Sequence, residues 1–337
     1  LSFRPSRYAP MAAASDRDPD RTGSASSSPD APSSPSAAEE SAEHGDTAPV
    51  DYTERILKGS TSVFSGSMVG KAVGFALQLV LARGLGQALF GLYSLGLTVL
   101  RLAESVATLG LQNGIVRFAA PSHERGDAAQ VKGTFLASAG LGLLAGIVIG
   151  TGLFVASPWL ATAVFNDPDM EWVLAVFACG LPFYVLTYLA SRMARALGKM
   201  RVDVLLDSIL QPVLFLVLVG SLLAVGQGFT AALYSFLAST VLAAGVGLYA
   251  VVRLFPPLLS GLAPDYEIRT LLRFSLPVIG VTLASIGMTY ADRFMLGMLS
   301  TAEAVASYQA AASLSVQMRF VLFAVTAAFS PIISDLY

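Results

Sequence analysis

Two stretches of this 337-residue chain contain no charged side chain, and their length limits what the chain can fold into. One runs for 45 residues from Ser208 to Val252, and the other for 34 residues from Gly133 to Asn166. A helix of about 20 apolar residues, rising about 1.5 Å per residue, crosses the hydrocarbon layer of a bilayer. The longer stretch therefore predicts two membrane-spanning helices, joined at Gly226-Gln227-Gly228 because glycines favour a turn.

The remaining charges separate further apolar segments, and together they predict eight spanning helices. Charged residues make up 13% of the chain, about half of their share in a soluble domain, so we expect an all-α, polytopic transmembrane helical bundle. The expected helices lie at about 59–82, 89–116, 133–166 with a bend at Ser157-Pro158, 172–191, two within 208–252, 274–299 and 304–334.

Three domains follow from this pattern. Residues 1–50 are rich in Ser, Ala, Pro and Asp with few large apolar side chains, which predicts a disordered acidic tail. Residues 51–255 are expected to form a first six-helix transmembrane bundle, and residues 256–337 the first two helices of a second bundle.

The basic residues predict how the helices are oriented. They gather in every second connection, and short connections rich in Lys and Arg stay in the cytoplasm. We therefore expect a multi-pass protein with a cytoplasmic N-terminus. The residues concerned are Arg55, Lys58, Arg117, Arg125, Lys132, Arg192, Arg195, Lys199, Arg201, Arg253, Arg269 and Arg273.

A faint internal repeat relates the first pair of helices to the last pair. A shift of 215 residues places Lys58 on Arg273, Leu81 on Leu296 and Tyr93 on Tyr308. The second copy begins after six spans, so both copies have the same orientation, as in transporters built from parallel repeats.

The composition argues against several classes of function. The single cysteine, Cys179, lies in an apolar run, and the two histidines, His44 and His123, lie far apart in polar segments. These residues predict neither a disulfide framework nor a metal site. The sequence has no nucleotide-binding loop, zinc-protease motif or nucleophile–histidine pair. We expect a protein that is not an enzyme, needs no cofactor and binds no nucleic acid.

Two short motifs flank the turn between the first two expected helices. They are Ala82-Arg83-Gly84-Leu85-Gly86 and Phe90-Gly91-Leu92-Tyr93. With the helix pattern around them, they resemble the polysaccharide transporters (oligosaccharide flippases) of the multidrug/oligosaccharidyl-lipid/polysaccharide flippase superfamily. The resemblance extends more weakly from about Tyr52 to the last residue.

This resemblance implies a function and a larger architecture. Such proteins translocate lipid-linked oligosaccharides or polysaccharide repeat units across the cytoplasmic membrane, by alternating access of two six-helix bundles around a central cavity. The implied partners are membrane lipids, an undecaprenyl-type lipid-linked glycan, and a glycan polymerase or glycosyltransferases. Because this chain stops after the second helix of the second bundle, we expect it to be a truncated or partial chain.

Three basic residues fall inside expected spans, where a charged side chain costs about 3 kcal/mol and normally faces a cavity or a partner. They are Lys71, Arg101 and Arg319. The functional interpretation is that they converge on a water-filled cavity and hold the phosphate or pyrophosphate of a lipid-linked sugar, the substrate class that the resemblance implies. The alternative is structural: Arg101 forms a buried ion pair with Glu104, and Lys71 extends to the membrane interface.

Orienting roles are expected for two neighbours of these bases. Gln78 follows Lys71 by seven residues, which places both on one face of a helix. Glu104 follows Arg101 by three residues and shares its face, so it would keep the guanidinium group oriented.

Two further groups of charges lie near the ends of expected helices. Asp292 and Arg293 are adjacent and point about 100° apart on a helix, which favours a structural or gating role over direct ligand contact. Four bases at the cytoplasmic end of the fourth helix either attract anionic lipid headgroups or form an entrance for the substrate, with Asp203 and Asp207 as their expected partners. These bases are Arg192, Arg195, Lys199 and Arg201.

Two other functions fit the same sequence. A cation-coupled multidrug exporter of the same superfamily is expected to carry an acidic residue in the first helix, where this chain has Lys71. A non-transporting membrane fragment or scaffold would fit the small number of helices.

Overall fold

The computed structural model of this chain describes the backbone of residues 48–226 and 228–315, and side chains from Ser65 onward within them. The chain divides into two compact units, Leu1–Glu54 and Arg55–Tyr337. All elements of the described residues are helices, which confirms the predicted fold class. Most of the predicted tail, Arg319 and most of the last expected helix lie outside the described residues.

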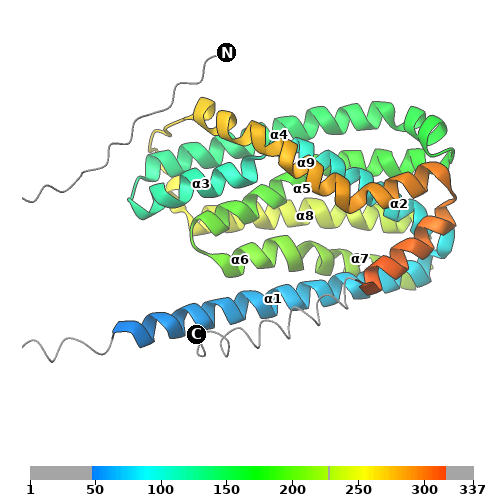
Figure 1. Cartoon of the computed structure of the whole chain (residues 1–337), viewed down its shortest axis with the longest axis horizontal. Coiled ribbons are helices and arrows are strands. Elements are labelled where there is room, and N and C mark those ends of the chain that lie inside the picture. The colour runs from blue at the N-terminus through cyan, green and yellow to red at the C-terminus, as the bar shows by residue number, and fades with distance from the viewer. Residues whose placement is uncertain (1–47, 227, 316–337) are drawn as a thin grey trace, which may run out of the picture. The chain divides into compact units, whose positions relative to one another are not determined.

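The elements follow one another along the chain in the order drawn in Figure 1. They are α1 (Ala48–Leu85), α2 (Gln87–Ala107), α3 (Leu111–Glu124), α4 (Ala128–Trp159), the π-helical turn η1 (Leu160–Val164), α5 (Asp169–Ala196), α6 (Met200–Val204), the π-helical segment η2 (Leu205–Leu210), α7 (Gln211–Ala224), α8 (Phe229–Leu254), the 3₁₀ turn η3 (Pro256–Leu258) and α9 (Ile268–Leu299).

Seven segments of the described residues are long and apolar enough to cross a membrane, so the chain is a multi-pass membrane protein. They are Ser65–Leu85, Gln87–Ala107, Ala128–Val164, Asp169–Ala196, Met200–Ala224, Phe229–Leu254 and Ile268–Leu299. The eighth expected helix is helical at 302–315, and the rest of it lies outside the described residues.

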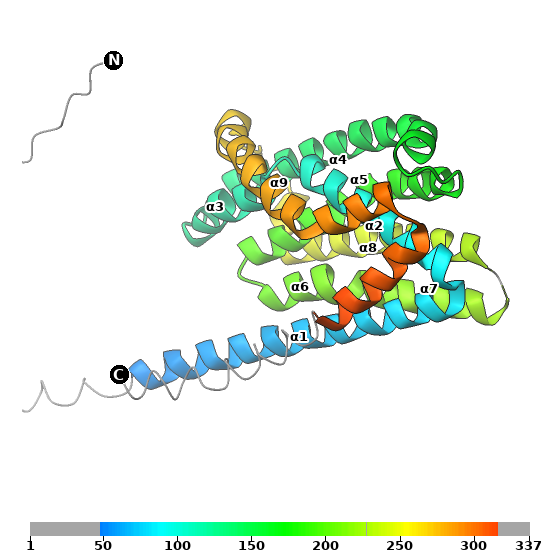
Figure 2. The same cartoon turned by 45° about the vertical axis from the view of Figure 1, so that its right-hand side comes forward.

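Within residues 55–337 the connections lie alternately at two ends of the bundle (Figures 1 and 2). One end holds the connections from α3 to α4, from α5 to α6 and from α8 to α9. The other end holds the turns from α1 to α2, from α4 to α5 and from α7 to α8. The basic connections of the sequence thus share one end, which we call the basic end; that it faces the cytoplasm stays a prediction.

Helices α2 and α5 form the centre of the bundle, and an aromatic cluster joins them to α7 and α8. Within the most apolar 18-residue stretch of each helix, 61% of the residues of α2 and 67% of those of α5 are buried, compared with 17% for α4 and 11% for α9. The ring of Phe177 on α5 lies 4.5 Å from that of Phe236 on α8 and 5.6 Å from that of Tyr93 on α2. Phe215 on α7 lies 5.9 Å from Phe236. The motif that ends in Tyr93 therefore belongs to the packed core.

The turn between α1 and α2 lies where the first motif predicts it. Gly86 separates the two helices with a φ of 77°, a left-handed conformation that glycine adopts without steric cost. In the last hairpin, Ser300 and Thr301 separate α9 from the helix at 302–315. Thr301 follows Gly86 by 215 residues, the spacing of the proposed repeat.

The second expected helix, 89–116, is not continuous in the structure. It breaks after Thr108, where Leu109 has a φ of 51° and Gly110 a φ of 68°, and α3 starts at Leu111. The backbone of Ser275 on α9 occupies the space that a Cβ of Gly110 would need. The break therefore lets α9 approach the bundle closely, which the largely apolar sequence of this segment does not reveal.

We expect Gly110→Ala to lower stability more than Gly126→Ala. Both glycines have left-handed backbones, with φ of 68° and 77°, so alanine costs about 1–2 kcal/mol at either position. Nothing lies within 4 Å of a Cβ at Gly126, whereas one at Gly110 would overlap Ser275. Thermal unfolding of both variants in one detergent measures the crowding at Gly110, and equal losses of stability would contradict it.

The connection between α8 and α9 is attached to the start of α4. The Lys132 ammonium group donates to the Ser260 carbonyl at 2.6 Å, and the Asp265 amide donates to the Ala129 carbonyl at 3.1 Å. Helix α9 also packs on α2 and α3. The division into two bundles at residue 255 stays a prediction.

Helix α1 contacts the π-helical segment η2 and the residue before it through two glycines. A Cβ at Gly66 would lie 3.1 Å from the Val204 side chain, and one at Gly70 would lie 2.5 Å from the Ser208 carbonyl oxygen. The absence of side chains at these two positions brings the α1 backbone against η2.

Candidate functional site

Polar side chains in the spanning helices gather around two cavities. The smaller cavity, of about 60 Å³, lies between α2, α5, η2 and α7. Its lining residues are Arg101, Tyr184, Thr187, Tyr188, Leu206, Asp207, Gln211 and Pro212. The larger cavity, of about 220 Å³, lies between α1, α9 and the helix at 302–315. Its lining residues are Lys71, Gly74, Phe75, Gln78, Arg293, Gln309 and Ser313.

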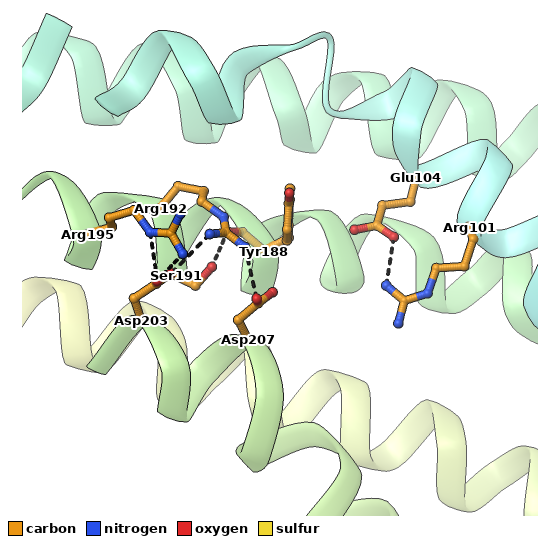
Figure 3. A network of polar contacts seen from close by, with 8 residues as sticks. All are labelled: Arg101, Glu104, Tyr188, Ser191, Arg192, Arg195, Asp203 and Asp207. Atoms are coloured by element: carbon orange, nitrogen blue, oxygen red, sulfur yellow. Dashed lines mark hydrogen bonds and ion pairs between the residues drawn. The ribbon is translucent and has the colours of Figure 1, made fainter. Parts of the chain in front are cut away.

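At the smaller cavity Arg101 is held by one carboxylate and one aromatic ring. The Arg101 guanidinium group donates to the Glu104 carboxylate at 3.1 Å and lies 5.0 Å from the centre of the Tyr184 ring. Glu104 is buried, with 7% of its surface exposed. Figure 3 shows the Glu104 side chain projecting from α2 toward the part of α5 that carries Tyr188. The predicted partner of Arg101 therefore contacts it.

A series of ion pairs extends from this cavity to the basic end (Figure 3). Arg192 on α5 contacts Asp207 at 2.9 Å and Asp203 at 3.4 Å. Arg195 contacts Asp203 at 2.5 Å through one nitrogen and at 2.7 Å through Nε. Asp203 is almost fully buried, and Asp207 projects from the π-helical segment η2. We call these four residues together with Arg101 and Glu104 the charged network.

The larger cavity brings together side chains from both ends of the described sequence. The Ser313 hydroxyl group donates to the Gln78 side-chain oxygen, which joins α1 to the helix at 302–315. The Arg293 guanidinium group lies 5.2 Å from the centre of the Tyr290 ring, and its buried Nε has no hydrogen-bond partner among the described residues. Lys71 faces the same space from α1.

The ring of Tyr290 on α9 packs against Arg293 of the larger cavity. Cations and aromatic rings attract each other through the negative face of the ring. This contact therefore helps to hold the Arg293 guanidinium group in place.

The structure separates the predicted site residues into groups. Lys71, Gln78 and Arg293 share the larger cavity, whereas Arg101 lines the smaller one beside Glu104. Arg319 lies outside the described residues. The roles assigned to these residues stay predictions.

The other predicted residues lie away from the larger cavity or at the basic end. Asp292 does not line the larger cavity, although the adjacent Arg293 does. Its carboxylate instead accepts a hydrogen bond from the Tyr308 hydroxyl group. Arg192 and Arg195 are engaged with Asp203 and Asp207, the partners that the sequence suggested. Lys199 and Arg201 are exposed at the basic end.

Sequence reasoning missed the uncharged polar partners of these cations. Tyr184, Tyr188 and Arg192 follow one another at intervals of four residues, so one face of α5 carries all three. Gln309 and Ser313 have the same spacing on the helix at 302–315. This periodicity in tyrosine, glutamine and serine was the available signal.

Of the residues that the structure describes, two cations and no carboxylate line the larger cavity, which suits an anion, whereas the smaller one is lined by both Arg101 and Asp207. Guanidinium and ammonium groups form charge-assisted hydrogen bonds with phosphate oxygens, and the glutamine and serine side chains add neutral hydrogen-bonding groups. Among the described residues, no group of three or more His, Cys, Asp or Glu side chains is placed to hold a metal ion.

A multi-pass helical bundle with charged cavities between its helices belongs to the class of membrane transport proteins. A family model described as polysaccharide biosynthesis protein matches residues 56–337, and the chain belongs to this family. The match confirms the family resemblance of the sequence, and members of the family are transporters rather than enzymes. No curated protein and no solved structure matched the chain.

Proposed function

We propose that this protein is a flippase that translocates lipid-linked oligosaccharides or polysaccharide repeat units across the cytoplasmic membrane by alternating access. The basic end and the N-terminus face the cytoplasm. The phosphate-bearing head of the lipid carrier interacts with Lys71 and Arg293 in the larger cavity and with Arg101 in the smaller one. The family supports the substrate class, since its members serve polysaccharide biosynthesis.

The observation that carries this proposal is the larger cavity. Lys71 and Arg293 come from helices more than 200 residues apart in sequence, yet they line one space of about 220 Å³. The Arg293 Nε is buried and has no hydrogen-bond partner among the described residues, and a buried donor of this kind costs free energy until a ligand accepts from it. A phosphate group provides the required oxygen atoms.

Deletion of the encoding gene in the source organism tests the proposal. We expect the strain to lose surface polysaccharide and to accumulate the lipid-linked oligosaccharide on the cytoplasmic side, and expression of the full-length gene to reverse both effects. Extraction of lipids and quantification of their glycans measure the accumulation.

The same strain separates the alternatives. A multidrug exporter predicts normal surface polysaccharide with increased sensitivity to drugs. A scaffold predicts loss of polysaccharide without accumulation of the lipid-linked precursor. Either result would contradict the flippase proposal.

A further inference from the structure

The charged network is electrically balanced. Within the described residues it contains three guanidinium groups, of Arg101, Arg192 and Arg195, and three carboxylates, of Glu104, Asp203 and Asp207. A charge in a low-dielectric interior is costly unless an opposite charge lies beside it. Any event that removes one partner from a pair therefore leaves an unfavourable charge behind.

Arg101 is the cation of the charged network that lines the smaller cavity, where the Asp207 carboxylate also lies. The Arg101 side chain is 38% exposed and lines the smaller cavity, whereas the Glu104 side chain is only 9% exposed and does not line it. An anion in this cavity would meet the guanidinium group and compete with the carboxylate for its hydrogen bonds. The cavity would gain a negative charge, and Glu104 would lose its partner.

The surroundings of Glu104 offer no replacement cation among the described residues. Five charged or titratable groups in this described part of the chain interact electrostatically with Glu104. They are Arg101 from α2, Tyr184, Tyr188 and Arg192 from α5, and Asp207 from η2. Arg192 already contacts Asp203 and Asp207, and the negative charge of Asp207 opposes a second charge on Glu104. Binding of one proton to Glu104 would restore neutrality.

We propose that Glu104 is a proton-binding site linked to Arg101, and that a phosphate-bearing anion at Arg101 binds together with one proton on the Glu104 carboxylate. This inference rests on the proposed function, because it requires an anionic ligand at Arg101. The proton comes from the solvent and remains on a Glu104 oxygen while the anion is bound. Linkage between the two sites is reciprocal, so a lower pH raises the affinity for the anion.

Calorimetric titration of the purified full chain with farnesyl pyrophosphate tests the inference. The same titration in two buffers with different ionisation enthalpies gives the number of protons exchanged on binding. We expect an uptake of about one proton, and an affinity that falls by up to about tenfold per unit increase in pH.

The variant Glu104→Gln is expected to lose the proton uptake but to keep the binding. Glutamine imitates the protonated carboxyl group, so this variant should bind farnesyl pyrophosphate at pH 8 at least as tightly as the wild type, without the proton uptake. A role of Glu104 in packing alone would weaken binding. Glu104→Asp should restore the uptake, and Glu171→Gln, at an exposed carboxylate, should leave it unchanged.

The outcomes separate this inference from the proposed function. Binding by the wild type without proton uptake, or with an uptake that persists in Glu104→Gln, would overturn the proton site and leave the flippase proposal standing. No binding of farnesyl pyrophosphate by the wild type would overturn both. Should Glu104→Gln not fold, the proton count of the wild type decides on its own.

Discussion

Asp203→Ala is expected to lower the free energy of unfolding by about 3 kcal/mol, the lower part of the range for a buried ion pair that loses one partner. Asp203 is only 2% exposed and holds both Arg192 and Arg195. Its removal leaves Arg192 with Asp207 alone, in a segment where Arg192 is itself buried. The Arg195 side chain is 44% exposed and can turn toward water, which places the loss at the lower end of the range.

Thermal unfolding of the purified protein in detergent measures this loss. Glu171→Gln removes a charge from an exposed position of α5 and should change the free energy of unfolding by less than about 0.5 kcal/mol. A melting temperature of Asp203→Ala equal to that of this control would mean that the ion pairs of the charged network contribute little to stability.

The double variant that combines Arg101→Ala and Glu104→Gln is expected to reduce export of surface polysaccharide by about 10- to 100-fold. A hydrogen bond to a charged group contributes about 1.5–3 kcal/mol, and each 1.4 kcal/mol is about tenfold in binding. The double replacement matters because Arg101→Ala alone would leave the buried Glu104 carboxylate without its partner, and that variant could lose activity by unfolding. Together the two changes remove the cation without leaving a buried charge.

Export is measured as surface polysaccharide in the deletion strain, with the amount of membrane protein determined in parallel. Arg253→Ala is the matched control, because this arginine contacts Tyr249 on an exposed face of α8 near the basic end and lines neither cavity. Wild-type export by the double variant would show that Arg101 does not hold the substrate.

The positions of the spanning helices could be predicted because a membrane imposes a simple requirement. Long uncharged runs had to form helices, and glycines marked the turns at Gly86 and Gly226, where the backbone has a positive φ. The break at Leu109 and Gly110 could not be predicted in this way, because it depends on the approach of Ser275 from α9, far along the chain.

The cations of the site could be recognised individually, since a charge within an apolar run is conspicuous. Their grouping could not be recognised, because the rotation of each helix about its axis decides which side chains meet. Arg101 and Lys71 thus line different cavities. Arg293 lines the same cavity as Lys71, whereas the adjacent Asp292 does not. Neutral partners such as Tyr290 resemble ordinary packing residues until the helices are placed.

The close approach of Gly70 to the Ser208 carbonyl has a mechanical consequence. Gly70 directly precedes Lys71 of the larger cavity, and Ser208 directly follows Asp207 of the smaller one. Because Gly70 has no side chain to separate the two backbones, a displacement of α1 toward η2 would press directly on the backbone next to Asp207. We therefore expect a bulky residue at position 70 to shift the backbone next to Asp207, and with it the ion pair of Asp207 and Arg192, without contacting either side chain.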